Sequence, residues 1–434
     1  MLTTGHKRAD APRCELDRTP VLYLDAARAS AAYAAVAATV QPLRVRYATK
    51  ANPHPALLAA LVAAGAEFAI TTQPELEALL ACGVAGARIA CVTPGPPASL
   101  LRRCQAAGVR RFAVDTIWEL RKVAALAPGA SVLVALRCAP AGRLRYPATP
   151  LGVSLAALDG LLEAARGLPV DLAGVAVHVG SQCERLAPWR AAVALAGAAW
   201  QRLWAAGYAP RVLSLGGGLP VRYRQAVPTP ATIARTLRAA LAAHFPAPPA
   251  EVWLEPGRYV AAGAGVLVAT VLGREECAGR RPRLTLNVGR YHGLPEAALG
   301  IRYPYQALPG SPHPSPLPGG EGVRRPHPGP LALGEGERGS HAGPLAGGEG
   351  ARGSLERCVL VGPGGAGDVL DPVARLPRLV AGDRLCFLQA GAYTACQATY
   401  PVAAGGPAMR LGAPWSWRAG DGLSEARPWV WAPA

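Results

Sequence analysis

Lys50, in the segment YATKAN, is the residue of this chain whose chemistry is easiest to name. The chain has only three lysines, Lys7, Lys50 and Lys122, and the other 42 of its 45 basic residues are arginines. Arginine stays charged at any useful pH and cannot form an imine, whereas a partly desolvated lysine amine can attack an aldehyde and hold it as a Schiff base. Because Lys50 follows a predicted strand, we interpret it as a catalytic lysine rather than a surface lysine.

Polar motifs also follow other predicted strands. Arg137 ends SVLVALR, His178 follows LAGVAV, the glycines Gly216, Gly217 and Gly218 follow RVLSL, and Glu255 and Arg258 follow EVWL. If these strands are parallel and form a closed barrel, their carboxyl ends meet at one face, where the active sites of such barrels lie. The sequence therefore predicts one active site assembled from all of these motifs.

Each motif suits a phosphorylated pyridine. Consecutive glycines let backbone N–H groups approach a phosphate, and Arg258 could pair with the same phosphate. Glu255 could keep a pyridine nitrogen protonated, which makes the ring an electron sink, and His178 could stack on the ring face. The alternatives are a tight turn for the glycines, a salt bridge to Arg137 or Arg258 for Glu255, and a structural role for His178.

The elements that position these motifs alternate between short apolar runs and longer helix-like stretches. Strands are predicted at 44–49, 67–70, 87–92, 111–114, 131–137, 172–177, 211–215 and 251–254, and helices at 55–64, 74–82, 98–107, 117–125, 154–166, 187–206 and 230–244. Such alternation indicates parallel strands joined by crossover helices. Eight strands in this length predict a (β/α)₈ barrel over 42–257, with a doubly wound open sheet as the alternative.

A second, mostly β domain is predicted over 258–407. The runs GVLVATVLG, RLTLNV, RCVLVGP and RLCFLQ are strand-like and have few helical stretches between them. Within residues 1–41, the strand-like segment TPVLYLD at 19–25 could join this sheet. Residues 408–434 are predicted to be a C-terminal tail.

Residues 313–354 are three tandem copies of a 14-residue unit, beginning with HPSPLPGGEGVRRP. The units are rich in proline and glycine and have no apolar face that stacking could bury. We therefore predict a disordered insertion that leaves the β domain at a surface turn.

The composition argues against several classes of protein. The net charge of +17 comes from arginines spread along the chain, whereas nucleic-acid binding normally needs a clustered basic surface. No apolar run is long enough to span a bilayer, and no segment resembles a signal peptide. The ten cysteines have neither CxxC pairs nor regular spacing, so we expect no metal site and no disulfide framework. A cytoplasmic protein without nucleic-acid or membrane partners is expected.

The motifs YATKAN, HVGSQ, LGGG, EPGRY and AGAYT together resemble the alanine-racemase-fold decarboxylases that use pyridoxal 5'-phosphate, the ornithine/diaminopimelate/arginine decarboxylase family. This resemblance implies that Lys50 bonds to the cofactor, His178 stacks on it and Glu255 meets the pyridine nitrogen. It further implies phosphate binding by Ser181, the glycine loop, Arg258 and Tyr393. We also place Arg137 and Gly257 among the cofactor-binding residues. It also implies a homodimer in which each active site borrows residues from the partner's β domain.

Departures from the family pattern concern the reaction and the substrate. Where the family has GPxCD or GPxCES, this chain has GPGGAGDVL at 362–370, so the proton-donating cysteine is missing and Asp368 is the acid that remains. Phe68-Ala69 replaces the FD dipeptide of ornithine decarboxylases, and Arg302-Tyr303-Pro304 occupies the segment that supplies an acid for a distal amine. A buried ammonium needs a carboxylate partner. Neither ornithine nor lysine is therefore expected as the substrate, and Arg302 could face a substrate carboxylate. The candidate substrate residues are Asp368, Arg302 and Tyr303.

The sequence leaves three hypotheses. The first is a decarboxylase of a small amino-acid substrate, with water, His292 or another group supplying the final proton. The second is a different reaction on the same cofactor, such as racemisation. The third is a catalytically impaired homologue with a regulatory or binding role, which the missing cysteine supports and the retention of Lys50 opposes.

Overall fold

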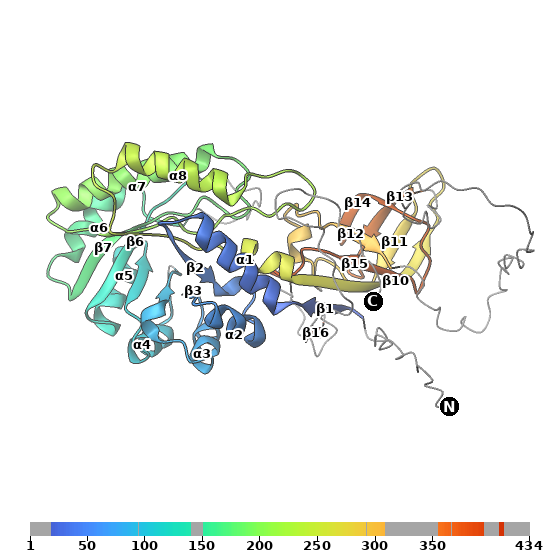
Figure 1. The fold of residues 1–434 in the computed structure, drawn as a ribbon, viewed down its shortest axis with the longest axis horizontal. Helices are drawn as coiled ribbons and strands as arrows, with labels where there is room; N and C mark the ends of the chain where they lie inside the picture. Colours follow the sequence, from blue (N-terminus) through green and yellow to red (C-terminus); the bar gives the residue numbers. More distant parts are fainter. Residues whose placement is uncertain are drawn as a thin grey trace, which may run out of the picture.

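The computed structural model describes residues 19–93, 95–139, 151–291, 293–308, 355–365, 367–394 and 408–411. The chain forms two lobes, a barrel and a sheet domain (Figure 1). The repeats at 313–354 and residues 412–434 lie outside the described residues, so the predictions for them stay predictions.

The barrel contains eight parallel strands, and it closes because the first strand pairs with the last. The strands are β2 (Arg44–Ala48), β3 (Glu67–Ile70), β4 (Ile89–Cys91), β5 (Arg111–Val114), β6 (Ala130–Ala135), β7 (Val170–Ala176), β8 (Val212–Ser214) and β9 (Glu251–Leu254). This closure confirms the predicted (β/α)₈ barrel and excludes the open sheet.

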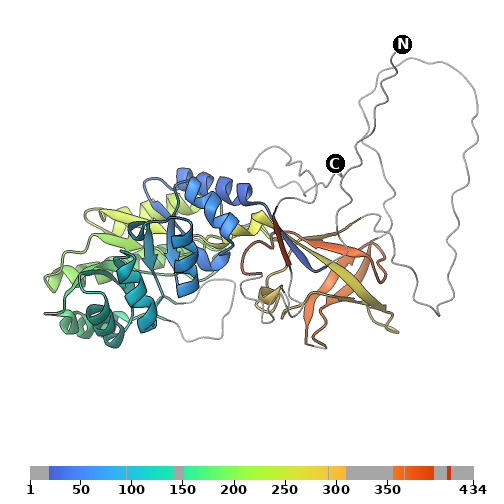
Figure 2. The same ribbon diagram turned by 90° about the horizontal axis from the view of Figure 1, so that it is seen from below.

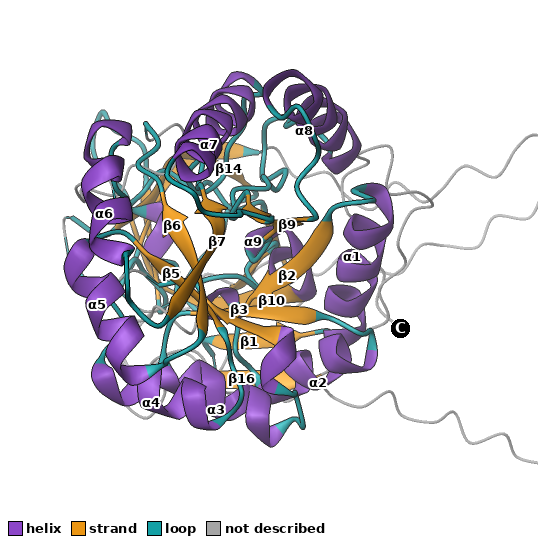
Figure 3. Ribbon diagram, turned by 90° about the vertical axis from the view of Figure 1, so that its left-hand side faces the viewer, coloured by secondary structure: helices purple, strands orange, loops and turns teal. Residues whose placement is uncertain are grey.

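Helices surround the barrel strands on the outside (Figure 3). They are α1 (Ala26–Thr39), α2 (Pro55–Ala63), α3 (Gln73–Ala81), α4 (Ala98–Ala106), α5 (Ile117–Leu126), α6 (Leu158–Ala165), α7 (Ala187–Ala205) and α8 (Pro230–His244). Several begin at a capping side chain: Thr72 accepts from the Glu75 amide before α3, and Thr116 accepts from the Glu119 amide before α5. Such caps satisfy N–H groups that have no partner within the helix.

Two apolar layers hold the barrel together. The larger lies between the outward-facing strand residues and the helices, and it includes Val132 and Val134 of β6. A separate small cluster contains Leu133, Ala173, Val212 and Trp253, from β6, β7, β8 and β9. Because side chains alternate along a strand, Leu133 faces opposite to its neighbours and the small cluster fills the barrel interior.

The second domain is the predicted mostly β domain. Its strands are β1 (Val21–Leu24), β10 (Gly265–Glu275), β11 (Arg283–Leu286), β12 (Tyr305–Ala307), β13 (Glu356–Val361), β14 (Val369–Leu376), β15 (Arg384–Phe387) and β16 (Ala408–Leu411). The sheet runs in the order β12-β15-β10-β11-β13-β14, and the neighbours are antiparallel except for the parallel pair β11–β13. The short helix α9 (Arg258–Ala261) leads from the barrel into β10.

The N-terminal segment belongs to both lobes. Strand β1 pairs antiparallel with β10 and parallel with β16, and the chain then enters α1 on the barrel. Figure 2 shows this blue strand in the sheet domain, while the helix that follows it lies on the barrel. Strand β16 is part of the segment for which the sequence predicted a tail. The β domain is therefore attached to the barrel by chain at both ends of the barrel sequence.

Two kinds of feature are absent from the described residues. None of their helices is long and apolar enough to cross a lipid bilayer. They also contain no group of three or more His, Cys, Asp or Glu side chains that could hold a metal ion.

Candidate active site

Lys50 lies at the carboxyl end of β2, in a 3-10 turn over Thr49–Ala51. Its side chain is exposed on the face of the barrel where the strands end. The EPGRY segment packs directly beneath this turn: a Cβ added to Gly257 would lie 2.8 Å from the Cβ of Ala51 and 3.1 Å from that of Ala48. Glycine at 257 therefore allows the turn that carries Lys50 to approach the end of β9.

His178 follows β7 and lies near Lys50, at the carboxyl end of the barrel strands. We call the space between Lys50, His178 and the segments after β8 and β9 the recess. Its Nδ1 atom accepts a hydrogen bond of 3.1 Å from the backbone N–H of Gly217, which fixes the ring and leaves its face exposed. Surrounding protein and the nearby Lys50 amine lower the pKa of His178 to about 4. The imidazole is therefore neutral near pH 7, with one nitrogen already engaged as an acceptor.

The glycine loop that follows β8 is shaped by close backbone contacts. Gly216 has a φ of +64°, and a Cβ there would lie 2.4 Å from the carbonyl oxygen of Val177. A Cβ on Gly217 would lie 2.9 Å from the carbonyl oxygen of Glu255, and one on Gly218 would lie 2.8 Å from that of Gly180. Side chains cannot be accommodated here, so the backbone itself forms this surface of the recess.

Glu255 follows β9 and is held on one oxygen. Its Oε1 atom accepts from the hydroxyl of Ser214 at 2.6 Å and from the indole N–H of Trp253 at 2.9 Å. The Ser214 hydroxyl in turn accepts from the Gly216 amide, and the Glu255 amide donates to the Gly216 carbonyl at 2.8 Å. The carboxylate is therefore tied to the glycine loop, and its partners are Ser214 and Trp253 rather than Arg137 or Arg258.

Arg258 is buried at the start of α9, where its guanidinium meets Glu296. The two terminal nitrogens lie 2.5 and 2.6 Å from the two carboxylate oxygens of Glu296, and they also donate to Tyr223 at 3.0 Å and Ser181 at 2.9 Å. Burial alone would lower the pKa of Arg258, but Tyr223 and Glu296 outweigh it and hold this pKa well above its usual value.

Glu296 is the residue of this site that the sequence reasoning missed. It is fully buried and belongs to the β domain, in a short 3-10 turn over Pro295–Ala297. An acidic residue within the apolar segment LPEAALG was the available signal, because a buried carboxylate requires a cationic partner. Nothing in the sequence, however, indicated which of the many arginines that partner is.

The Arg258 contacts affect how a phosphate can be held. Both terminal nitrogens make two hydrogen bonds each, and the Nε atom is buried without an acceptor among the described residues. Arg258 is thus already neutralised, and it orients the Ser181 hydroxyl toward itself. In the glycine loop, the amides of Gly216 and Gly217 already donate to Ser214 and His178. The Gly218 amide and the Ser181 hydroxyl are therefore the groups that a phosphate would meet first.

Tyr393, from the AGAYT motif, connects the β domain to the Lys50 turn. Its backbone has a φ of +57°, and its amide donates to the carbonyl of Ala51 at 2.8 Å. The guanidinium carbon of Arg258 lies 4.9 Å from the centre of the Tyr393 ring. Asn52 adds a second tie, since its side-chain amide donates to the Gly391 carbonyl at 2.7 Å.

Arg137 has a different environment from the other predicted residues. Its Nε atom donates to the carbonyl of Gly152 at 3.0 Å, and the Gly152 amide donates to Asp115 at 3.1 Å. Its side chain is exposed at the end of β6. Arg137 therefore stands on the same face of the barrel and holds the segment that returns toward α6.

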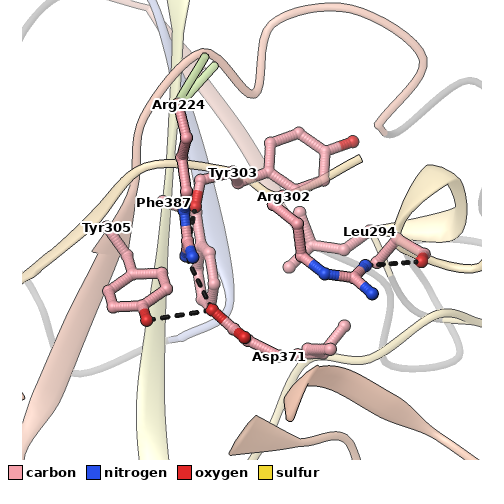
Figure 4. A pocket seen from close by; sticks show the side chains of 9 residues that line it. Arg224, Leu294, Arg302, Tyr303, Tyr305, Asp371 and Phe387 are labelled. Atoms are coloured by element: carbon pink, nitrogen blue, oxygen red, sulfur yellow. Dashed lines mark hydrogen bonds and ion pairs between the residues drawn. The ribbon is translucent and has the colours of Figure 1, made fainter. Parts of the chain in front are cut away.

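Arg302 and Tyr303 line a small pocket with Arg224, Tyr305 and Asp371 (Figure 4). Arg224 donates to Asp371 at 2.7 Å, Tyr305 donates to the same oxygen at 3.0 Å, and Arg302 donates to the carbonyl of Ala297 at 3.2 Å. The enclosed volume is about 10 Å³, room for a single water molecule.

The pocket is joined to Arg258 through aromatic rings. The rings of Tyr223 and Tyr303 meet edge to face, with their centres 5.5 Å apart. Tyr223 also accepts from Arg258. Tyr303 of the β domain therefore contacts Tyr223, which in turn accepts a hydrogen bond from Arg258.

Asp368 is fully buried in the loop between β13 and β14. Its two oxygens accept from the backbone amides of Arg290 at 2.7 Å and Gly364 at 3.0 Å. These bonds hold two loops of the β domain together. Within the described part of this single chain, Asp368 does not line the Arg302 pocket.

The donors fit pyridoxal phosphate. The barrel end offers an amine at Lys50, an open imidazole face at His178 and an anchored carboxylate at Glu255. A side-chain-free glycine backbone lies beside them. The structure connects His178, the glycine loop and Glu255, and Lys50 lies near His178. Ser214, Trp253 and Glu296 join the predicted residues, whereas Arg137 bonds to Gly152 instead.

Comparison with known proteins also indicates a pyridoxal-binding domain. The family described as "Pyridoxal-dependent decarboxylase, pyridoxal binding domain" matches residues 27–262. An ornithine decarboxylase of Neurospora crassa is 31% identical over 231 residues, which are 52% of this chain and 46% of that protein. A diaminopimelate decarboxylase of Pseudomonas fluorescens is 32% identical over 268 residues, covering 58% of this chain and 64% of that protein.

Similarity to solved structures extends further along the chain. A lysine/ornithine decarboxylase of Vibrio vulnificus, crystallised with cadaverine, superposes with a TM-score of 0.72 at 25% identity. That superposition covers 91% of this chain and 94% of the Vibrio chain. By sequence, in contrast, the chain spans about half the length of the curated relatives it matches.

Proposed function

Because the chain belongs to the pyridoxal-dependent decarboxylase family, with a pyridoxal-binding domain over residues 27–262, we propose that it decarboxylates an amino acid on a cofactor bonded to Lys50. The observation that carries the proposal is the meeting of Lys50, His178 and Glu255 at the carboxyl end of the barrel. These residues follow three different strands. His178 and Glu255 both bond to the glycine loop, and Lys50 lies close enough to His178 to lower its pKa.

The chain's own groups have distinct roles in this proposal. The cofactor, when bound, supplies an electron sink for the bond that breaks at the substrate α-carbon. Lys50 supplies the amine that holds it, and His178, neutral above about pH 4, presents an uncharged face to the ring. Glu255 presents a carboxylate to the pyridine nitrogen, and the Gly218 amide with the Ser181 hydroxyl receives the phosphate.

The substrate that we propose is not a simple diamino acid. Ala69 stands where the family pattern has an acid, and the segment 302–304, which supplies another acid in the family, has none here. The Asp371 carboxylate beside Arg302 already accepts from Arg224 and Tyr305. A distal ammonium would therefore be desolvated without a carboxylate of its own. Arg302 and Arg224 favour a distal carboxylate instead, and the water-sized pocket between them would have to widen to admit it.

A panel of amino acids tests this substrate class. Ornithine, lysine and arginine would be compared with glutamate, aspartate and meso-diaminopimelate, with release of labelled carbon dioxide as the readout. We expect turnover of substrates that carry a distal carboxylate, and Arg302→Ala should raise KM for them more than it lowers kcat. Efficient turnover of ornithine alone would contradict the proposed specificity.

We also propose a homodimer that shares its active sites. In this chain the loop that contains Asp368 and the Lys50 turn belong to different domains, and Asp368 does not line the described pocket. A partner's β domain could bring this loop to the recess. Sedimentation velocity would show a dimer of the 44.7 kDa chain, whereas a monomer that retains full activity would contradict the shared site.

Covalent trapping tests the cofactor assignment. The purified protein would be incubated with pyridoxal 5'-phosphate, reduced with borohydride, digested and analysed by mass spectrometry. We expect the phosphopyridoxyl group on the peptide that contains Lys50. Lys50→Ala should lose both the label and the visible absorption band. Lys122→Ala is the matched control, because Lys122 pairs with Glu119 on α5 at 2.9 Å, away from the recess.

One observation favours a second candidate function. Gly364 and Gly365 occupy the segment where the family pattern has a cysteine, and this loop is held closed by Asp368. A chain that binds the cofactor but releases no carbon dioxide from any amino acid would fit a regulatory homologue. Interconversion of amino-acid enantiomers without carbon dioxide would instead indicate a racemase.

A further inference from the structure

A network of ion pairs lies at the amino-terminal end of the barrel strands, opposite the end that carries Lys50. Arg46 of β2 lies 2.9 Å from Glu67 and 3.1 Å from Glu251, at the starts of β3 and β9. Arg111 of β5 pairs with both oxygens of Glu251, at 2.8 and 3.1 Å. Arg44, at the rim, contacts both glutamates. Three guanidinium groups against two carboxylates leave this network with one excess positive charge.

Trp253 lies between this network and the active site. Its side chain is fully buried in the barrel interior. The guanidinium carbons of Arg46 and Arg111 lie 4.2 and 5.3 Å from the centre of its ring, within the range of a cation–π interaction. On its other side, the Trp253 indole N–H donates to Glu255 at 2.9 Å.

The hydrogen bonds to Glu255 are asymmetric. Trp253 and Ser214 both donate to Oε1, and Oε2 has no hydrogen-bond partner in the described part of the chain. Donors aimed at a carboxylate stabilise its charged form, and a ring polarised by neighbouring cations is a stronger N–H donor. The arrangement therefore holds the carboxylate by one oxygen and leaves the other available.

We propose that Trp253 is a positioning residue that holds Glu255 as an oriented anion, with Oε2 directed at the pyridine nitrogen, and that Arg46 and Arg111 strengthen this effect through the indole ring. The inference rests on the proposed cofactor site. It adds that the protonation of the cofactor ring is set partly by charges on the opposite side of the barrel core. A bulky residue that merely fills the barrel would not need an N–H group pointing at Glu255.

The direct test measures the protonation of the pyridine nitrogen. Wild-type protein and the variant Trp253→Phe would be loaded with pyridoxal phosphate labelled with ¹⁵N in the ring, and the ¹⁵N chemical shift followed against pH. Phenylalanine keeps an aromatic ring against the arginines but removes the donor. Without the donor, Glu255 is a stronger base, so we expect the proton shared between it and the pyridine nitrogen to move toward Glu255. The ¹⁵N shift of Trp253→Phe should then show an equilibrium between the two sites that is about tenfold less favourable to the nitrogen, the size expected for one hydrogen bond to a charged group.

Matched variants separate positioning from packing. Trp200→Phe is the control, since Trp200 is buried on α7 against Phe245 and should leave the titration unchanged. Ser214→Ala, which removes the other donor, should shift it in the same direction as Trp253→Phe. Arg111→Met should give a smaller shift in that direction, and it carries the test if Trp253→Phe does not fold.

The experiment distinguishes failure of this inference from failure of the proposed function. A normally loaded Trp253→Phe or Arg111→Met protein with an unchanged ¹⁵N titration would overturn the inference and leave the cofactor assignment intact. A wild-type protein that takes up no labelled cofactor would overturn the proposed function itself.

Discussion

Arg258 and Glu296 form a bidentate ion pair that links the barrel to the β domain. Only 3% of the Arg258 surface and none of the Glu296 surface is exposed. Arg258 begins the helix that leaves the barrel, whereas Glu296 lies in a turn of the second domain. The pair therefore stabilises the domain arrangement, and it sets the charge next to Ser181, where the cofactor phosphate is expected.

Replacing Glu296 with glutamine should destabilise the cofactor-free protein. Arg258 would remain buried with its charge unbalanced, which typically costs about 3–5 kcal/mol, and the retained amide oxygen places the expected loss near the lower value. Urea unfolding of the apo protein measures this loss. Glu163→Gln, in an exposed pair with Arg166, is the control and should change stability by less than about 1 kcal/mol.

The same variant should respond more strongly to the cofactor. A phosphate bound beside Arg258 would supply the negative charge that Glu296→Gln removes, so pyridoxal phosphate should raise the Tm of the variant more than that of the wild type. An equal rise in both proteins would show that the phosphate does not sense the Arg258 charge.

The cofactor-free protein should lose stability in mild acid because of His178. The pKa of this histidine is about 4 in the folded chain, compared with 6.5 when unperturbed, so the unfolded chain binds the proton first as pH falls. The contribution is complete above about pH 6.5 and declines as pH falls toward 4. The exposed ring face makes the energy smaller than full burial would.

A histidine variant isolates this effect. His178→Gln should show a weaker loss of stability between pH 7 and about pH 4.5 than the wild type, measured by urea unfolding. His244→Gln, at the exposed end of α8, is the matched histidine control. Identical slopes in all three proteins would contradict the low pKa of His178.

Alanine at Gly216 should be far more damaging than alanine at another glycine with positive φ. Both Gly216 (+64°) and Gly207 (+86°) lie in the left-handed region, where alanine costs about 1 kcal/mol. A Cβ at 216 would also lie 2.4 Å from the Val177 carbonyl oxygen and 2.9 Å from His178 Nδ1, whereas nothing lies within 4 Å of one at 207.

We expect Gly216→Ala to lose about 3 kcal/mol of stability and to weaken cofactor binding, because the loop must move. Gly207→Ala should bind the cofactor normally. Thermal unfolding and fluorescence titration with pyridoxal phosphate measure both quantities, and equal behaviour of the two variants would refute the steric argument.

Removing the charge of Asp371 should loosen the pocket beside Arg302. Burial alone would raise the pKa of Asp371, but the Val373 amide, Arg224 and Tyr305 outweigh it and hold this pKa below its usual value. The stabilisation is therefore present above the unfolded pKa of about 3.8 and is lost as pH falls below it.

Asp371→Asn should consequently cost about 1.5–3 kcal/mol at pH 7, the range for hydrogen bonds to a charged group, and little at the acid end. Asp159→Asn, in an exposed pair with Arg202, provides the control and should be nearly neutral. An Asp371→Asn protein as stable as the wild type at pH 7 would show that the network contributes nothing.

The sequence alone determined the barrel, the mostly β domain and the identity of the cofactor. Strand and helix periodicity is local, and eight alternating units can pair in few ways, so the order of elements fixed the barrel face on which Lys50, His178 and Glu255 must lie. The sequence motifs at these strand ends were specific because imine chemistry needs lysine and close phosphate contact needs glycine.

The tertiary structure alone decided which partners these residues have. Arg258 could have paired with a phosphate or with any of several acids, and the fold placed Glu296 of the second domain against it. Glu255 was expected to meet a pyridine nitrogen or an arginine, and the fold gave it Ser214 and Trp253 as donors. The physical reason is that burial of a charged or polar group requires a partner but does not specify which one. Packing between segments distant in sequence determines which partner lies within hydrogen-bond distance.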